Sequence, residues 1–126
     1  MFPNALNVYK NNSVQHSSKD QMLIMLVDGA VRFSKQSEEA LKNKDMKKSH
    51  EYLVRTQDII TELMVSLDTS AGDWAVQMFN VYSFIKEKLV EANLKKDVNV
   101  LHEAMPLINE VRDIWHEANK ISKQQR

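Results

Sequence analysis

The chain has 126 residues, enough for one domain; its two glycines, two prolines and lack of cysteine disfavour a turn-rich β fold and exclude disulfides and thiolate metal sites. Its 17 Lys and Arg residues balance 17 Asp and Glu residues, so it lacks the basic field that binds nucleic acid. The N-terminus lacks the pattern of a secretory signal, and no apolar run is long enough to cross a bilayer, so we expect a cytoplasmic protein without membrane insertion.

Residues 1–17 are rich in Asn and Ser and are predicted to form an irregular N-terminal arm. The arm is either a disordered tail or a segment whose apolar side chains cover a groove of the folded domain. The side chains that would cover such a groove are Phe2, Leu6, Val8 and Tyr9.

The first helix is predicted at about residues 18–43, and its N-cap candidates are Ser17, Ser18 and Asp20. Residues 22–27 are all apolar, so at ~100° per residue their side chains point around the whole helix. The stripe expected in the core is Leu23, Leu26, Val27, Ala30 and Phe33. Ile24, Met25 and Val31 point elsewhere and need cover from this chain or a partner. Gly29 either permits a close approach of another backbone or is a tolerated surface glycine.

Three further amphipathic helices are predicted at about residues 46–68, 74–95 and 98–123. Their expected N-caps are Asp45, Asp73 and Asp97. The third carries one apolar face, which is made of Trp74, Met78, Val81, Tyr82, Ile85, Leu89 and Ala92. Pro106 should kink or split the last helix. Short loops between four long helices predict an all-α, antiparallel four-helix bundle over residues 18–123, with a frayed tail at 124–126.

The last helix carries a second apolar stripe at intervals of seven residues, beside its expected core face. This stripe is Val100, Leu107, Ile114 and Ile121. A weaker second set on the third helix is Val76, Phe79, Val90 and Leu94. Such wide apolar arcs indicate either tight packing in a compact bundle or a groove that accepts a further amphipathic helix.

The sequence offers little for catalysis or metal binding. His16, His50, His102 and His116 lack a compact ligand spacing and are expected to be surface residues. A di-iron bundle would need Glu-x-x-His on two helices, and no histidine here has Glu three positions before it. We therefore expect no enzyme, no metal site and no cofactor.

Several segments, in their order and spacing, resemble the flagellin export chaperones (FliS), and together they cover nearly the whole chain. The segments are Asn12-Ser13-Val14, Leu26-Val27-Asp28-Gly29-Ala30-Val31-Arg32-Phe33, Arg55-Thr56-Gln57-Asp58-Ile59-Ile60-Thr61-Glu62-Leu63, Leu67-Asp68, Val81-Tyr82, Leu89-Val90-Glu91-Ala92-Asn93-Leu94-Lys95-Lys96-Asp97 and Val111-Arg112-Asp113-Ile114-Trp115.

The resemblance implies a cytoplasmic helical-bundle chaperone whose client is the disordered C-terminal segment of flagellin. Binding would prevent premature polymerisation and support export by the flagellar type III secretion apparatus, whose components are candidate further partners. The resemblance implies neither nucleotide nor metal. The chain is expected to be a monomer or weak homodimer. The competing hypothesis is a structural or regulatory four-helix module that self-associates through the same apolar faces and has no export client.

The partner-binding residues predicted by combining the resemblance with the surplus apolar surface come from three helices. They are Met25, Val31, Phe79, Tyr82, Asn93, Leu94, Val100, Leu107 and Ile114. Asn93 could hydrogen-bond the client backbone, or it could cap the end of the third helix.

Overall fold

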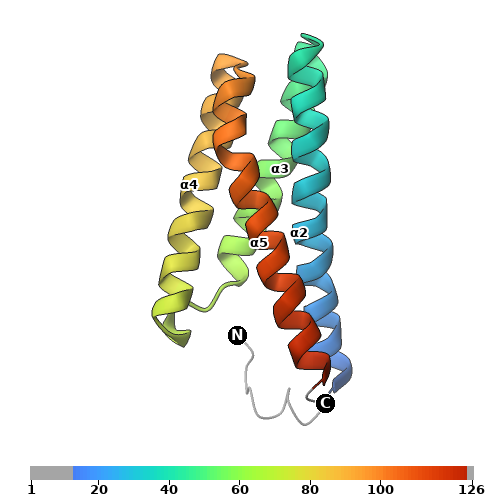
Figure 1. Cartoon of the computed structure of the whole chain (residues 1–126), viewed down its shortest axis with the longest axis vertical. Coiled ribbons are helices and arrows are strands. Elements are labelled where there is room, and N and C mark those ends of the chain that lie inside the picture. Colours follow the sequence, from blue (N-terminus) through green and yellow to red (C-terminus); the bar gives the residue numbers. More distant parts are fainter. Residues whose placement is uncertain (1–12, 125–126) are drawn as a thin grey trace.

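The protein is a bundle of four long helices that alternate in direction along the chain (Figure 1). The computed structural model describes residues 13–124, with side chains from Ser18 onward, and no strand occurs in this part of the chain. Each helix packs on its neighbour in sequence, and the first helix also packs on the last, which closes the ring. The elements are α2 (Ser13–Lys42), α3 (Met46–Ser66), the short 3-10 helix η1 (Thr69–Ala71), α4 (Asp73–Lys95) and α5 (Val98–Gln124). The predicted all-α antiparallel bundle is confirmed.

Side-chain caps explain where several helices begin. The Asp45 carboxylate accepts a hydrogen bond from the Lys48 backbone N–H, which caps α3 as predicted. The Asp97 carboxylate accepts from the backbone N–H of Asn99 at 2.8 Å and does the same for α5. The predicted cap of α4 is wrong by one residue, because Gly72 is the N-cap and Asp73 is the first helical residue.

The start of α2 also differs from the prediction. The helix begins at Ser13, so the expected N-caps Ser17, Ser18 and Asp20 lie inside it. Ser and Asp favour caps but are tolerated inside a helix, so their presence did not mark its boundary. The other arm residues, including Phe2, Leu6, Val8 and Tyr9, lie outside the described residues, as does the end of the tail after Gln124.

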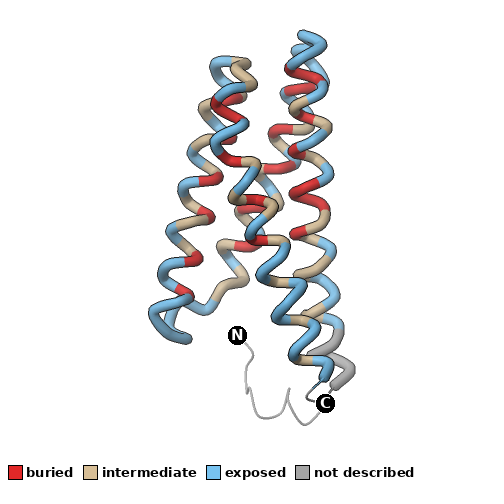
Figure 2. Tube along the Cα trace, viewed as in Figure 1, coloured by how far each residue is buried: buried red, intermediate tan, exposed pale blue. Residues whose placement is uncertain are grey.

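The core runs along the bundle axis and is apolar over most of its length (Figure 2). Its largest fully buried apolar side chains come from all four helices and are Val27, Leu53, Ile60, Leu63, Tyr82, Ile85, Leu89, Leu101 and Ile108. Buried serines and threonines satisfy their hydroxyls locally; Thr56, for example, donates to the Tyr52 carbonyl at 2.8 Å. The wide apolar arcs are therefore used partly for compact packing.

The structure gives the exposure of two residues that the sequence left open. Val31 is only 6% exposed and belongs to the core, because α2 packs on both α3 and α5 and so buries a wide arc. Trp74 is 52% exposed, because it is the second residue of α4 and lies at the end of the bundle. Gly29 is buried, and a Cβ there would lie 3.2 Å from Ile59 Cδ1. The close approach at Gly29 is thus made by a side chain of α3.

α5 continues through Pro106 as one helix and is not split. Pro106 is exposed, so the His102 carbonyl that loses its helical partner can be hydrated. This placement limits the cost of proline inside the helix without removing it.

Replacing Pro106 with alanine should therefore stabilise the fold. Alanine restores one backbone hydrogen bond and removes the ring clash with the preceding turn, so we expect the free energy of unfolding to rise by about 1–3 kcal/mol. Urea denaturation followed by circular dichroism measures the change. A lower free energy of unfolding in the Pro106→Ala variant would show that the proline sets a helix shape the bundle requires.

Candidate functional site

The second apolar stripe of α5 becomes more exposed along the helix. Val100 is 7% exposed, Leu107 is half-buried, Ile114 is 43% exposed and Ile121 is 45% exposed. Figure 1 shows α4 and α5 separating as they run away from the turn that joins them, and Figure 2 shows mostly exposed residues on this half of α5. The stripe is therefore covered near the α4–α5 turn and uncovered at the opposite end, which we call the open end.

Aromatic side chains join α4 to α5 near the open end. The Trp115 indole N–H donates to the Tyr82 hydroxyl at 2.7 Å, and Trp74 contacts Trp115 edge to face with ring centroids 6.4 Å apart. Burial raises the pKa of Tyr82, so its hydroxyl stays neutral and can accept this hydrogen bond. We refer to five apolar side chains in this part of the bundle as the apolar surface at the open end: Trp74, Leu107, Ile114, Trp115 and Ile121.

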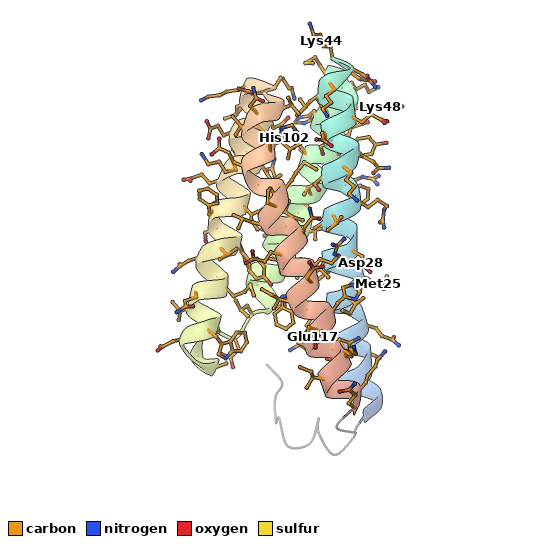
Figure 3. The ribbon with its side chains drawn as sticks, in the orientation of Figure 1. Met25, Asp28, Lys44, Lys48, His102 and Glu117 are labelled. Atoms are coloured by element: carbon orange, nitrogen blue, oxygen red, sulfur yellow. The ribbon has the colours of Figure 1, made fainter. Side chains whose placement is uncertain are left out.

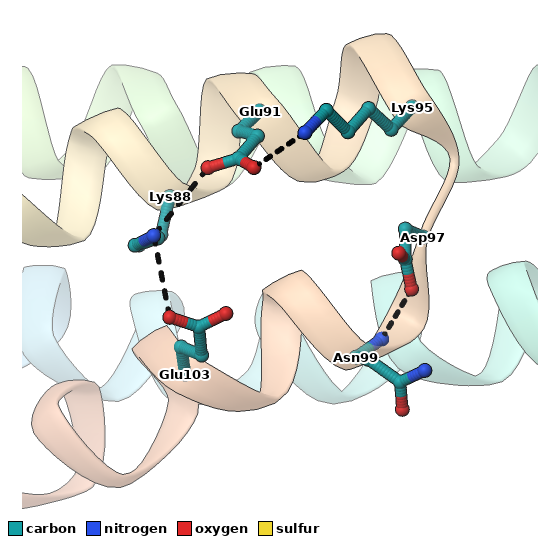
Figure 4. Close-up of polar contacts among 6 residues, drawn as sticks. All are labelled: Lys88, Glu91, Lys95, Asp97, Asn99 and Glu103. Atoms are coloured by element: carbon teal, nitrogen blue, oxygen red, sulfur yellow. Dashed lines mark hydrogen bonds and ion pairs between the residues drawn. The ribbon is translucent and has the colours of Figure 1, made fainter.

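Ion pairs hold α4 and α5 together near the other end (Figure 4). The Lys88 ammonium lies 3.2 Å from a Glu103 oxygen of α5 and 3.4 Å from Glu91 of its own helix. Glu91 also accepts from Lys95 at 2.8 Å. The hydrogen bond to Glu103 is the main cause that raises the pKa of Lys88. The two helices are thus joined by polar contacts where the stripe is covered and by aromatic contacts at the open end.

The predicted partner-binding residues are divided between core and surface. Val31, Tyr82 and Val100 lie in the core, where their side chains offer almost no surface to a partner. The half-buried residues are Phe79, Asn93 and Leu107. The exposed residues are Met25, Leu94 and Ile114, of which Leu94 is 80% exposed. Leu94 lies in the last turn of α4 and Ile114 in the open half of α5, so these residues line the length of the bundle without forming one pocket.

Asn93 joins the α4 end to α3. Its side-chain amide lies 3.0 Å from His50 Nδ1, and its carbonyl oxygen accepts from the Lys96 ammonium at 2.5 Å. Its side chain is thus engaged within the bundle. It does not cap α4, because Asn93 lies inside the helix and the C-cap residue is Lys96.

The sequence indicated the apolar surface between α3 and α4 only through Val90. Met64 and Val90 line an open pocket of about 360 Å³ together with Ser83, Lys86 and Glu87. Val65 lies on the same helix as Met64 and is 77% exposed. Val65 lies outside the buried apolar stripe of α3, so the helical periodicity of that stripe did not single it out.

Two histidines connect α5 to α2. His102 Nε2 lies 2.6 Å from Glu38, and His116 Nε2 lies 2.7 Å from Asp28. Figure 3 shows Asp28 and His102 at two levels of this seam. Both histidines are exposed, as predicted, but the sequence did not reveal their partners, because those lie far away in the chain. No group of three potential metal ligands occurs among residues 13–124.

The contact between Glu38 and His102 should make the free energy of unfolding depend on pH in the acidic range. The hydrogen bond from His102 is the main cause that lowers the pKa of Glu38, with attraction to Lys42 adding to it. A lowered folded-state pKa stabilises the fold above the usual value of 4.5, and this contribution is lost as the pH falls through the lowered pKa. Because the carboxylate is 26% exposed, we expect less than about 1 kcal/mol.

When the pH is lowered from neutral to below 4.5, the free energy of unfolding should therefore fall less for Glu38→Gln than for the wild type. Urea denaturation over this pH range measures the difference. Glu39→Gln is the matched control, since it removes the adjacent exposed carboxylate, and it should keep the wild-type slope. Equal slopes for wild type and Glu38→Gln would contradict the assignment.

Comparison with known proteins agrees with this architecture. No helix among residues 13–124 is both long and apolar enough to span a membrane.

The chain is 29% identical to the flagellar secretion chaperone FliS of Bacillus subtilis (strain 168), over 98% of this chain and 92% of the relative. It is 28% identical to the protein of the same name from Escherichia coli (strain K12), over 85% of this chain and 80% of the relative. A family model described as flagellar protein FliS matches residues 2–122. Because that match covers nearly the whole chain, this protein belongs to the FliS family.

Proposed function

We propose that this protein is a cytoplasmic chaperone that binds the disordered C-terminal segment of flagellin, prevents its premature polymerisation and supports its export by the flagellar type III apparatus. The relatives are named flagellar secretion chaperones, which is a non-enzymatic role. The observation that carries the proposal is the apolar surface at the open end, where Ile114, Ile121 and Trp74 are each more than 40% exposed. Large apolar side chains exposed together at one end of a folded domain favour an interaction site there.

The shape of this surface favours a helical or extended segment over a compact ligand. Leu107, Ile114 and Ile121 recur every seven residues, which matches the apolar face of an amphipathic helix laid along α5. Burial of apolar area contributes ~25 cal/mol per Å², and ordering a disordered segment costs several kcal/mol. A client that wraps a large surface can offset that cost, so Met25, Phe79 and Leu94 extend the proposed contact area beyond the open end.

The core residues among the predicted contacts have a supporting role in this proposal. Tyr82 accepts the hydrogen bond that orients Trp115, and Val100 is the covered end of the stripe and packs in the core. Val31 belongs to the same core. We expect these side chains to shape the surface, and the exposed ones to contact the client.

The N-terminal arm completes the proposal. We propose that Phe2, Leu6, Val8 and Tyr9 cover the apolar surface in the free chain and leave it when the client binds. The first turns of α2 lie at the open end of the bundle, beside the C-terminal half of α5, so a segment attached there needs little length to reach the surface (Figure 1).

Suppression of flagellin assembly tests the proposed function. Equimolar chaperone should stop seeded polymerisation of flagellin, followed by light scattering. It should not bind a truncated flagellin that lacks the C-terminal segment, because that segment is the proposed client. A variant lacking residues 1–12 should suppress assembly at a lower ratio. Undiminished polymerisation at equimolar chaperone would contradict the proposal, and self-association alone would favour the structural module.

A further inference from the structure

Lysines gather at the end of the bundle opposite the open end. The α2–α3 and α4–α5 turns lie together there, because His50 of α3 and Asn93 of α4 are in hydrogen-bond contact (Figure 1). Figure 3 labels Lys44 and Lys48 at this end. We call this surface the lysine tip and define it as Lys44, Lys47, Lys48 and Lys96.

Two of these lysines occupy positions where the backbone favours glycine. Lys44 has φ of 58° and Lys96 has φ of 51°, and they are the two non-glycine residues of positive φ among residues 13–124. Lys96 directly follows α4, and Lys44 is the second residue after α2. At such positions glycine normally adopts the left-handed conformation without a steric penalty from Cβ. Fold stability therefore does not explain why both positions carry lysine.

The other two lysines lie at a helix end that disfavours cations. Lys47 and Lys48 are in the first turn of α3, which contains no acidic residue. The helix dipole places partial positive charge at this end, so carboxylates are favourable there and ammonium groups are unfavourable. Local backbone conformation or the helix dipole thus disfavours lysine at all four positions of the tip.

Two of the acidic groups near the tip are engaged in helix caps. The Asp45 and Asp97 carboxylates cap α3 and α5 through backbone N–H groups. Within the described part of the chain, no ion pair or hydrogen bond involves the ammonium groups of Lys44, Lys47 and Lys48. Their charge is therefore available to an external partner although the whole chain is neutral.

We propose that the lysine tip binds the surface of an anionic phospholipid bilayer. The four lysines lie in or beside the α2–α3 and α4–α5 turns, so their charges are spread over this end of the bundle. Lysine acts as a hydrated point charge without the bidentate geometry of arginine, which suits a diffuse array of phosphates. Met46 lies between Lys44 and Lys47 and is 43% exposed, so it can enter the headgroup region. The tip and the apolar surface lie at opposite ends, so lipid binding needs no client and does not depend on the proposed function.

Cosedimentation of the full chain with vesicles tests the proposal. The wild type should bind vesicles containing phosphatidylglycerol, fail to bind pure phosphatidylcholine, and be released by ~1 M salt, where the screening length is ~3 Å. The variant Lys47→Glu with Lys48→Glu reverses two charges and should lower the partition coefficient by about 100-fold or more. Because acidic residues suit the α3 N-terminus, its melting temperature should not fall.

A second variant separates lipid binding from folding. Lys44→Gly with Lys96→Gly should bind these vesicles about 10-fold or more weakly while unfolding at a higher temperature. The matched control for Lys47→Glu with Lys48→Glu is Lys120→Glu with Lys123→Glu on exposed positions of α5. It makes the same change in net charge at the open end and should keep wild-type binding. Equal losses in the control and tip variants, or no phosphatidylglycerol-dependent binding, would overturn the proposal. Binding to polyglutamate without binding to vesicles would also overturn it, in favour of an acidic protein partner.

Discussion

Leu89→Ala is expected to lower the free energy of unfolding by about 2–5 kcal/mol, a large part of the ~5–15 kcal/mol typical of a domain. Leu89 is 0% exposed and lies in the core of α4. Its truncation removes apolar contacts and leaves a cavity that close-packed neighbours fill only in part. Urea denaturation followed by circular dichroism measures the loss.

The same helix supplies a matched control. Leu94 lies five positions further along α4 and is 80% exposed, so Leu94→Ala removes the same atoms with little change in packing. We expect its free energy of unfolding to stay within about 0.5 kcal/mol of the wild type. Similar losses for the two variants would mean that Leu94 is covered in solution, for example by a second copy of the chain.

Ile114→Asp is expected to weaken binding of the flagellin C-terminal segment by about 10- to 100-fold, or ~1.4–2.8 kcal/mol. Ile114 is 43% exposed at the middle of the open half of the stripe. An aspartate there would place a charge within the apolar contact, where it would lose its hydration without gaining a partner. Because the side chain is already partly exposed, the free energy of unfolding should change by less than about 1 kcal/mol.

Asn80→Asp serves as the charge control for this variant. Asn80 is an exposed residue of α4, so the substitution adds the same negative charge outside the apolar surface. Its client affinity, measured by the same titration, should equal that of the wild type. If both variants bind the client with wild-type affinity, the client does not contact this part of α5.

The sequence predicted where a helix begins when an aspartate before it acts as the N-cap. Asp45 and Asp97 cap the helices that follow them, and the predicted starts at residues 46 and 98 match α3 and α5. The start of α2 was missed because Ser17 and Ser18 are favourable as N-caps but are also tolerated inside a helix. Pro106 favoured a break, yet its exposed position lets α5 continue.

The candidate surface could be predicted only in part, because exposure depends on neighbouring helices. The seven-residue stripe of α5 is a property of the sequence, but Val100 is buried and Ile114 is exposed because α4 lies close at one end and diverges at the other. The pairs of His102 with Glu38 and His116 with Asp28 join residues far apart in sequence, so one sequence alone cannot reveal them.

Calorimetric titration of the full chain with the flagellin C-terminal segment tests the central claim most directly. We predict near-stoichiometric binding at micromolar concentrations, with an enthalpy that becomes more negative as temperature rises, because apolar burial gives a negative heat-capacity change. The Ile114→Asp variant should bind more weakly in the same experiment. Absence of binding at micromolar concentrations, with the chain folded by circular dichroism, would contradict the account.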